Sequence, residues 1–459
     1  MLKKYFTLSI QTLKSEKIRR LIKESWAVSW PMMFIMTFEF LIGLSDVYVA
    51  GIFGQEVQAA YGLAFQIYFV FIIIGIALSI GSVTLVSQLF TSEKKEEFSL
   101  CVQTSIAASA CFGAVFTVLG VTFSRSIIQS LNIPIEIKNY ATPLLSIYSL
   151  AFVFDYVLLT TNGILRSCGM IRKSLQTMAI SCSLNIALNF ILALATPLGF
   201  KGIGWATVIS LTLGAVLNIF YIMKLVKLAF RFSVAIVKKI FDISWPSGLV
   251  QILWQSGAMV LFLIIGILPK QNVEIMAAFT NGLKIESAIF LPGFAFNMAA
   301  AVVVGNLLGK KDERGAFRGG IITAFIGVFI VTCLTILIMI NARFIASFLS
   351  DNPVVIEESV KYIYIALLVE PIAAWGIILS GGLNGAGDTK SVMIFTAVSI
   401  WLVRLPLSYI WGIYFGSGAA AIWWAMNVSA IVMVGLMTKR YFSKKWINLD
   451  IGINCADFT

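Results

Sequence analysis

The chain has 459 residues, of which 59% are hydrophobic and only 12% are charged, and its mean hydropathy is +0.93. Soluble chains are about half apolar and about a quarter charged, so this composition excludes a soluble globular protein and indicates a polytopic membrane protein. The absence of histidine excludes a His-ligated zinc site, a Ser-His-Asp triad and an imidazole proton shuttle. The six cysteines have no paired spacing, and we expect them to be structural.

Residues 1–25 carry seven Lys/Arg without an uninterrupted apolar core, which predicts a basic interfacial segment and not a cleavable signal peptide. Apolar segments follow that each reach the roughly 20 residues needed to cross a bilayer. These twelve segments lie at residues 26–51, 61–89, 100–123, 141–165, 174–197, 202–223, 241–268, 275–308, 319–341, 362–383, 391–415 and 417–438. We therefore predict an all-α polytopic membrane protein.

The net charge of +12 has an uneven distribution. The N-terminus, the even-numbered loops and the C-terminus hold 26 Lys/Arg, and the opposite loops hold six. By the positive-inside rule, both termini are expected in the cytoplasm, with the protein in a bacterial or archaeal inner membrane. This asymmetry explains the basic charge without a nucleic-acid partner.

The two halves of the chain repeat. Four short patterns recur in the same order at offsets of 215 to 219 residues: WPMMF at Trp30 with WPSGL at Trp245, SQLF at Ser87 with GNLLGKKDER at Gly305, GILRSCG at Gly163 with GGLNGAG at Gly381, and WATVIS at Trp205 with WAMNVS at Trp424. With six helices each, the halves predict two lobes related by a pseudo-two-fold axis along the membrane normal. The expected boundaries are 26–223 for the N-lobe, 224–240 for a cytoplasmic linker, 241–440 for the C-lobe and 441–459 for a cytoplasmic tail.

The first apolar segment contains two carboxylates, Glu39 and Asp46. Their spacing puts them on one face of a helix, about 10.5 Å apart along its axis. A carboxylate at membrane depth costs roughly 2.5–3.5 kcal/mol, and such residues are usually functional. We interpret the pair as ion- or substrate-handling groups; the alternative is a pair of buried structural acids.

Several stretches resemble the multidrug and toxic compound extrusion (MATE) family. GLSDVYVAG followed by AAYGLA resembles the first-helix signature, AAAVVVGNLLGKKDERGAF resembles the VGQ-x-LGA loop, and GGLNGAGDTK resembles the RGxGDT loop. LNIALNFIL followed by LGFKGIGWATVIS resembles the stretch from the fifth to the sixth helix. The resemblance spans residues 25 to 440. It implies a two-lobe rocker-switch transporter that exports organic compounds in exchange for H⁺ or Na⁺, without a cofactor.

The resemblance also implies site residues. Asp46 matches the first-helix aspartate linked to cation coupling, Asn185 matches the fifth-helix asparagine, and Thr207 matches the sixth-helix threonine. The chain departs from sodium-type members at Asn189, where those members have Asp. A missing carboxylate weakens a hard-cation site, although Na⁺ at Asp46 and Asn185 stays open. A lone carboxyl group in a low dielectric suits H⁺ better, because that environment favours its uncharged form. We therefore favour H⁺, with a pattern closer to DinF-like members.

Other charged residues fall within the apolar segments. Asp155 either joins Asp46 and Glu39 in an acidic cluster or is a structural acid bonded to a neighbouring hydroxyl. In the second half, Glu286 and Glu370 are candidates for a C-lobe site, and Lys284 lies two residues from Glu286 on a different face. The alternative role of Lys284 and Arg404 is to neutralise these two acids, since buried charges are usually paired.

We expect a cation-coupled antiporter, with H⁺ favoured over Na⁺, that exports lipophilic cationic compounds by alternating access. Its partners would be small organic substrates, the coupling ion and the lipid bilayer, and we expect a monomer. The alternative is a flippase for lipid-linked oligosaccharides, which would need a more basic cavity than five acids and two bases provide. We do not expect an enzyme, because the sequence offers no nucleophile or metal constellation.

Overall fold

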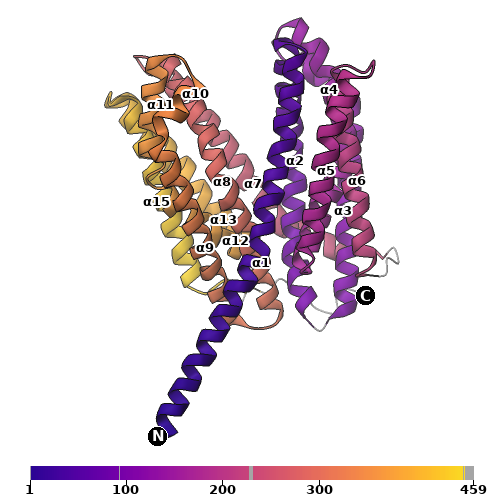
Figure 1. The fold of residues 1–459 in the computed structure, drawn as a ribbon, viewed down its shortest axis with the longest axis vertical. Helices are drawn as coiled ribbons and strands as arrows, with labels where there is room; N and C mark the ends of the chain where they lie inside the picture. Colours follow the sequence, from indigo (N-terminus) through magenta and orange to yellow (C-terminus); the bar gives the residue numbers. More distant parts are fainter. Residues whose placement is uncertain (1, 93, 227–230, 448, 450–459) are drawn as a thin grey trace. The chain divides into compact units, whose positions relative to one another are not determined.

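The computed structural model describes residues 2–92, 94–226, 231–447 and 449, with side chains from residue 16 onward. Within these residues all regular structure is helical. Contacts divide the chain into two compact units, which we call the N-lobe unit (Phe34–Gly248) and the C-lobe unit (residues up to Met33 together with Leu249–Leu449). The helices of each unit run side by side as a bundle (Figure 1).

The helices up to the middle of the chain are α1 (Leu2–Ile52), α2 (Gln55–Thr91), α3 (Lys95–Ser130), α4 (Ile135–Ser167), α5 (Ile171–Leu194), α6 (Lys201–Met223) and α7 (Val234–Gly266). The others are α8 (Asn272–Gly309), α9 (Glu313–Ile340), α10 (Ala342–Leu349), α11 (Pro353–Ala366), α12 (Glu370–Gly385), α13 (Thr389–Ala397), η1 (Val398–Arg404), α14 (Leu405–Tyr409), η2 (Ile410–Tyr414) and α15 (Gly418–Phe442). In the described chain, eleven helices are long and apolar enough to cross a membrane, and the number is twelve when the bent pair α11–α12 is counted as one span. The predicted all-α polytopic fold with twelve spans is confirmed.

The tenth span is broken where the sequence contains Glu370 and Pro371. The axes of α11 and α12 differ by 56°, and α12 begins at Glu370. Proline has no N–H to donate to the carbonyl of Leu367, which accepts a bond of 3.3 Å from the backbone N–H of Glu370 instead. The break places the carboxylate of Glu370 inside the bundle, where it is buried.

The eleventh span is irregular as well, because π-helical turns (η1 and η2) flank the short helix α14. Such wide turns inside a membrane helix occur frequently at functional sites. Arg404 is the last residue of η1, so the wide turn sets the direction in which its guanidinium points.

The basic N-terminal segment continues without a break into the first span, because α1 is a single helix of 51 residues. Its residues pack on α9 of the C-lobe unit: Lys17 forms an ion pair of 3.1 Å with Asp312, and the hydroxyl of Thr323 donates to Ser25 at 2.9 Å. The contact-based units therefore divide α1 at Met33. The lobe boundaries expected at 26–223 and 241–440 follow from counting spans and stay predictions.

Small residues allow close helix packing in each unit, as is usual in membranes. In the C-lobe unit, Gly381 and Gly385 of α12 face the backbone of α8 at Asn297 and Ala301, and a Cβ atom on either glycine would overlap a backbone carbonyl oxygen. In the N-lobe unit, Gly113 of α3 lies in the same way against the backbone of α4. The polar groups described below are therefore held between tightly packed helices.

Candidate functional site

Asp46 of α1 is buried at the centre of a polar cluster made with α5 and α6. The amide nitrogen of Asn189 donates to one carboxylate oxygen at 2.5 Å, and the hydroxyl of Thr207 donates to the other at 3.3 Å. Asn185 donates to Thr207 at 3.3 Å and accepts from Asn189 at 3.2 Å. The structure thus brings together the four residues that the family resemblance selected from three separate helices.

Asn189 is the residue at which the chain departs from the sodium-type pattern, and its amide nitrogen also lies 3.3 Å from the hydroxyl of Ser45. Its buried carbonyl oxygen has no hydrogen-bond partner among the described residues. An amide group carries donors on one side and an acceptor on the other. Asn189 can therefore donate to an ionised Asp46, or accept from a protonated Asp46 after its amide rotates.

Three buried tyrosines extend this cluster. Tyr61 of α2 interacts electrostatically with Asp46, and its ring lies 6.3 Å from that of Tyr148 of α4, measured between ring centres. Tyr148 in turn lies 5.5 Å from the ring of Tyr68, whose hydroxyl donates to Asp155 at 2.6 Å. Three tyrosine rings therefore connect Asp46 to Asp155.

The structure groups Asp155 with Glu39, while Asp46 lies in the separate polar cluster of α5 and α6. Glu39 is exposed and interacts electrostatically with Asp155 and with the buried Arg166 near the end of α4. The two acids of α1 thus have different environments, although the helix period puts them on one face. Asp155 is bonded to Tyr68 and interacts electrostatically with Glu39, and both roles considered for it stay predictions.

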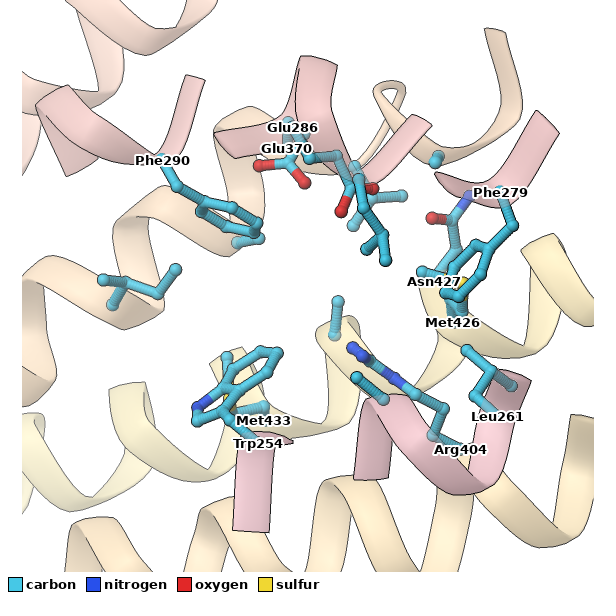
Figure 2. Close-up of a pocket in the computed structure, with 17 residues that line it drawn as sticks. Trp254, Leu261, Phe279, Glu286, Phe290, Glu370, Arg404, Met426, Asn427 and Met433 are labelled. Carbon is cyan, nitrogen blue, oxygen red and sulfur yellow. The ribbon is translucent and has the colours of Figure 1, made fainter. Parts of the chain in front are cut away.

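The C-lobe unit contains a cavity of about 140 Å³. Glu286 of α8 and Glu370 lie on one side of it, and Arg404 and Trp254 lie on the other (Figure 2). The remaining wall is apolar and mostly aliphatic, with Phe279, Phe290, Met426 and Met433 among its side chains, and it includes the amide of Asn427. Aromatic faces attract cations and methionine adapts to varied shapes, and this cavity combines such side chains with two acids and one base.

The charged groups of this cavity are held by polar partners. Tyr362 donates to Glu286 at 2.7 Å, and Arg404 donates to Ser429 at 2.8 Å while its guanidinium lies 5.4 Å from the centre of the Trp254 ring. Arg404 interacts electrostatically with both Glu286 and Glu370. Lys284 is exposed and is not among the residues that line the cavity. Of the two bases considered as counter-ions, Arg404 is therefore the one that faces these acids.

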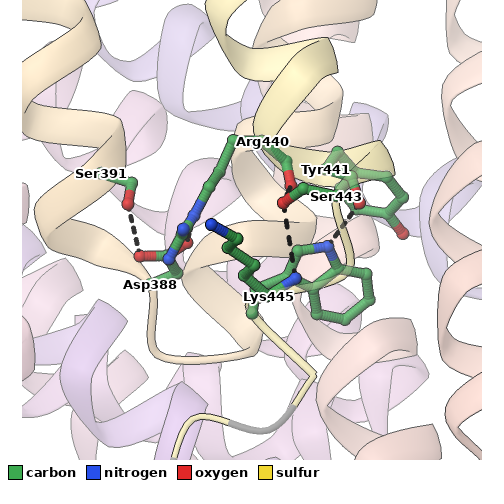
Figure 3. A network of polar contacts seen from close by, with 7 residues as sticks. Asp388, Ser391, Arg440, Tyr441, Ser443 and Lys445 are labelled. Atoms are coloured by element: carbon green, nitrogen blue, oxygen red, sulfur yellow. Dashed lines mark hydrogen bonds and ion pairs between the residues drawn. The ribbon is translucent and has the colours of Figure 1, made fainter.

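A further buried acid, Asp388, has a structural explanation. It follows α12 in the loop GGLNGAGDTK and accepts bonds of 2.6 Å from Arg440 and 2.7 Å from Ser391 (Figure 3). Arg440 lies in the last turn of α15, beside Tyr441, whose backbone oxygen accepts from the indole of the fully buried Trp446. This network joins the loop after α12 to the end of α15, and Asp388 is paired within it.

Several residues of these sites were absent from the sequence-based candidates: Tyr61, Tyr68, Tyr148, Arg166, Trp254 and Asn427. Tyr61 lies in the AAYGLA part of the family signature and could have been selected from it. The other tyrosines and Trp254 carry no such signal, because aromatic residues in membrane helices mostly pack against neighbouring helices or lipid. No group of three or more His, Cys, Asp or Glu able to hold a metal ion occurs in the described part of the chain.

Buried ionisable groups held between packed membrane helices are typical of secondary transporters. The family model described as MatE matches the chain twice, over residues 31–191 and 246–410, so this chain belongs to the MatE family. The two matches coincide with the internal repeat.

Relatives extend over nearly the whole chain. It is 26% identical to a probable multidrug resistance protein NorM of Thermotoga maritima (96% of each chain) and 22% identical to the uncharacterized transporter YisQ of Bacillus subtilis (92% of this chain, 94% of that one). Its fold is similar to that of an outward-facing multidrug resistance MATE transporter of the MOP superfamily (TM-score 0.87, 20% identity, 93% and 97% covered). It is also similar to that of a MOP superfamily transporter from Pyrococcus furiosus (TM-score 0.85, 20% identity, 93% and 97% covered).

Proposed function

We propose that this protein is a proton-coupled antiporter that exports lipophilic organic cations by alternating access, with Asp46 as the coupling group. One observation carries the proposal. A buried carboxylate is held by hydrogen bonds from two other helices, and the partners from those helices are uncharged. A carboxylate without a fixed counter-ion in a low dielectric exchanges readily between its ionised and its protonated form.

Protonation changes what Asp46 can bond. The ionised carboxylate accepts from Asn189 and Thr207, as in this structure. The protonated carboxyl group becomes a donor on one oxygen. If that is the oxygen bonded to Asn189, the amide has to rotate or move away; if it is the other, the Thr207 hydroxyl has to turn and accept. This exchange alters the contact of α1 with α5 and α6. Because a ligand shifts a conformational equilibrium only through its different affinity for the two states, a proton bound in one geometry and released in the other is a sufficient switch.

The choice of H⁺ over Na⁺ depends on Asn189. The oxygens of Asp46, Asn185 and Thr207 could ligate Na⁺, but the set contains a single carboxylate, which weakens a hard-cation site. The donor amide also lies toward Asp46, where a sodium-type member would present a second carboxylate.

The C-lobe cavity is our candidate for the organic substrate. Glu286 and Glu370 give it acidic character, Arg404 balances one of these charges, and the aliphatic, aromatic and methionine side chains of its wall accept the apolar part of a substrate. The positive-inside pattern further supports cytoplasmic termini in an inner membrane. In the alternative, a flippase for lipid-linked oligosaccharides, the cavity would be expected to be predominantly basic.

Dye efflux from proteoliposomes tests the proposal. Ethidium efflux would be measured with a pH gradient and with a Na⁺ gradient, each imposed alone. We expect efflux with the pH gradient and little with Na⁺. Efflux that requires Na⁺ would contradict proton coupling, and no efflux under either gradient would favour the flippase.

A further inference from the structure

One face of α5 is polar along most of the membrane. Polar residues recur at every third or fourth position: Ser174, Thr177, Ser181, Asn185 and Asn189. This period puts all five on one face of the helix, and each has 0% of its surface exposed. The stripe extends from Asn189 to Ser174, about 22 Å along the helix axis. A buried polar stripe of this length is more than the Asp46 cluster requires.

The stripe is bonded into networks at both ends. At the Asp46 end, Asn185 donates to Thr207 and lies 3.5 Å from Ser210 of α6. At the other end, Asn162 of α4 accepts from Ser174 and from Asn218 of α6, each at 2.8 Å. Three helices therefore supply polar groups to a single column between Asp46 and the end of α4.

The middle of the column contains polar atoms without partners. The hydroxyls of Thr177 and Ser181 and the side-chain oxygen of Asn218 are buried and have no hydrogen-bond partner among the described residues. Each such group costs roughly 1–3 kcal/mol unless it is satisfied. Gly214 of α6 lies beside Ser181, where a Cβ atom would be 2.6 Å from the serine hydroxyl. The glycine therefore allows α6 to lie close to the Ser181 hydroxyl.

The far end of the column is close to the surface. The chain turns at Gly169, which is exposed, and Arg172 just before Ser174 is exposed as well. This loop between α4 and α5 is among those expected on the cytoplasmic side from their Lys/Arg content. The column thus leads from the buried carboxylate toward the cytoplasmic face.

We propose that the column formed by Asn185, Ser210, Ser181, Thr177, Asn218, Asn162 and Ser174 conducts protons between Asp46 and the loop after α4 through bridging water molecules. Buried water typically satisfies unpaired polar groups with two to four hydrogen bonds. Each hydroxyl or water accepts one proton and passes one on, while the amides of Asn185, Asn218 and Asn162 hold the waters by hydrogen bonds and do not take up the proton. No group on the path therefore gains or loses charge overall. The inference rests on the proposed role of Asp46.

The surroundings of Asp46 suit this path. The titratable groups that face it are Tyr61 of α2 and Tyr148 of α4. From α5 and α6 it meets uncharged Asn and Thr side chains. Asn189 and Thr207 bond both to Asp46 and to Asn185, and so connect the carboxylate to the polar column along α5.

The test removes the unpartnered hydroxyls. In the full-length protein, Thr177→Val combined with Ser181→Ala nearly keeps the size of both side chains. It removes the two hydroxyl groups in the middle of the column. Proton movement would be followed with pyranine inside proteoliposomes while an ethidium gradient drives exchange. We expect the initial proton flux to fall about tenfold, with ethidium binding unchanged. Thr177→Ser, which keeps the hydroxyl, should behave as wild type.

The matched control is Thr212→Val on α6, because the Thr212 hydroxyl bonds to the carbonyl of Val208 in its own helix. It should leave the flux unchanged. A wild-type proton flux in the double variant would overturn the conduction path while leaving Asp46 coupling intact. Absence of proton flux in the wild type would overturn both.

Discussion

At the scale of single residues, the proposed preference of the Asp46 cluster for H⁺ over Na⁺ depends on Asn189. Asn189→Asp would place a second carboxylate beside Asp46 and supply the charged ligand that a sodium site needs. We expect Na⁺ affinity to rise at least about tenfold, equivalent to about 1.4 kcal/mol, and Na⁺-driven efflux to appear. Calorimetric titration with NaCl measures this affinity. Asn189→Leu, which adds no ligand, is the control, and an unchanged Na⁺ affinity in Asn189→Asp would contradict the assignment.

Arg404 sets the charge of the C-lobe cavity. Arg404→Gln would leave Glu286 and Glu370 without the cation that faces them, so the cavity should attract organic cations more strongly. We expect the Kd for ethidium to fall roughly tenfold, about 1.4 kcal/mol, as measured by its fluorescence in detergent. Lys284→Gln removes the same charge from the same unit at an exposed position outside the cavity and should have no effect. Equal affinities in wild type and Arg404→Gln would exclude this cavity as the substrate site.

At the scale of helices, the C-lobe unit depends on the close contact of α12 with α8. Gly385→Ala would push a methyl group into the carbonyl of Ala301, and overpacking of this kind costs typically 1–3 kcal/mol. We expect a lower Tm in detergent. Gly435→Ala in α15 is the matched control, because nothing lies within 4 Å of its Cβ position. A Tm equal to that of wild type in Gly385→Ala would show that the two helices are not tightly packed.

At the scale of the whole molecule, the sequence predicts the twelve spans because bilayer thickness fixes the length of each apolar segment. Asp46, Asn185, Asn189 and Thr207 could be grouped only through the family resemblance, since helix periodicity says nothing about contacts between helices. Their bonds in the structure agree with that grouping.

The burial of individual side chains and the position of irregular turns depend on how each helix is rotated about its axis and where it is interrupted. Composition does not determine either. The sequence therefore could not show that Lys284 is exposed while Glu286 is buried, or that π-helical turns precede and follow α14. It also could not separate Asp46 from Asp155 and place Tyr148 between them, because that arrangement depends on the packing of α2 and α4 around α1.

The account centres on one claim, that transport exchanges an organic cation for a proton at Asp46. The most direct measurement is proton movement driven by substrate alone, in proteoliposomes that contain pyranine and start without a pH or Na⁺ gradient. Adding ethidium outside should make the lumen of wild-type vesicles alkaline, because inward ethidium drives protons out. Asp46→Asn should abolish this signal and still bind ethidium. Proton movement that persists in Asp46→Asn, or that is absent in the wild type, would contradict the claim.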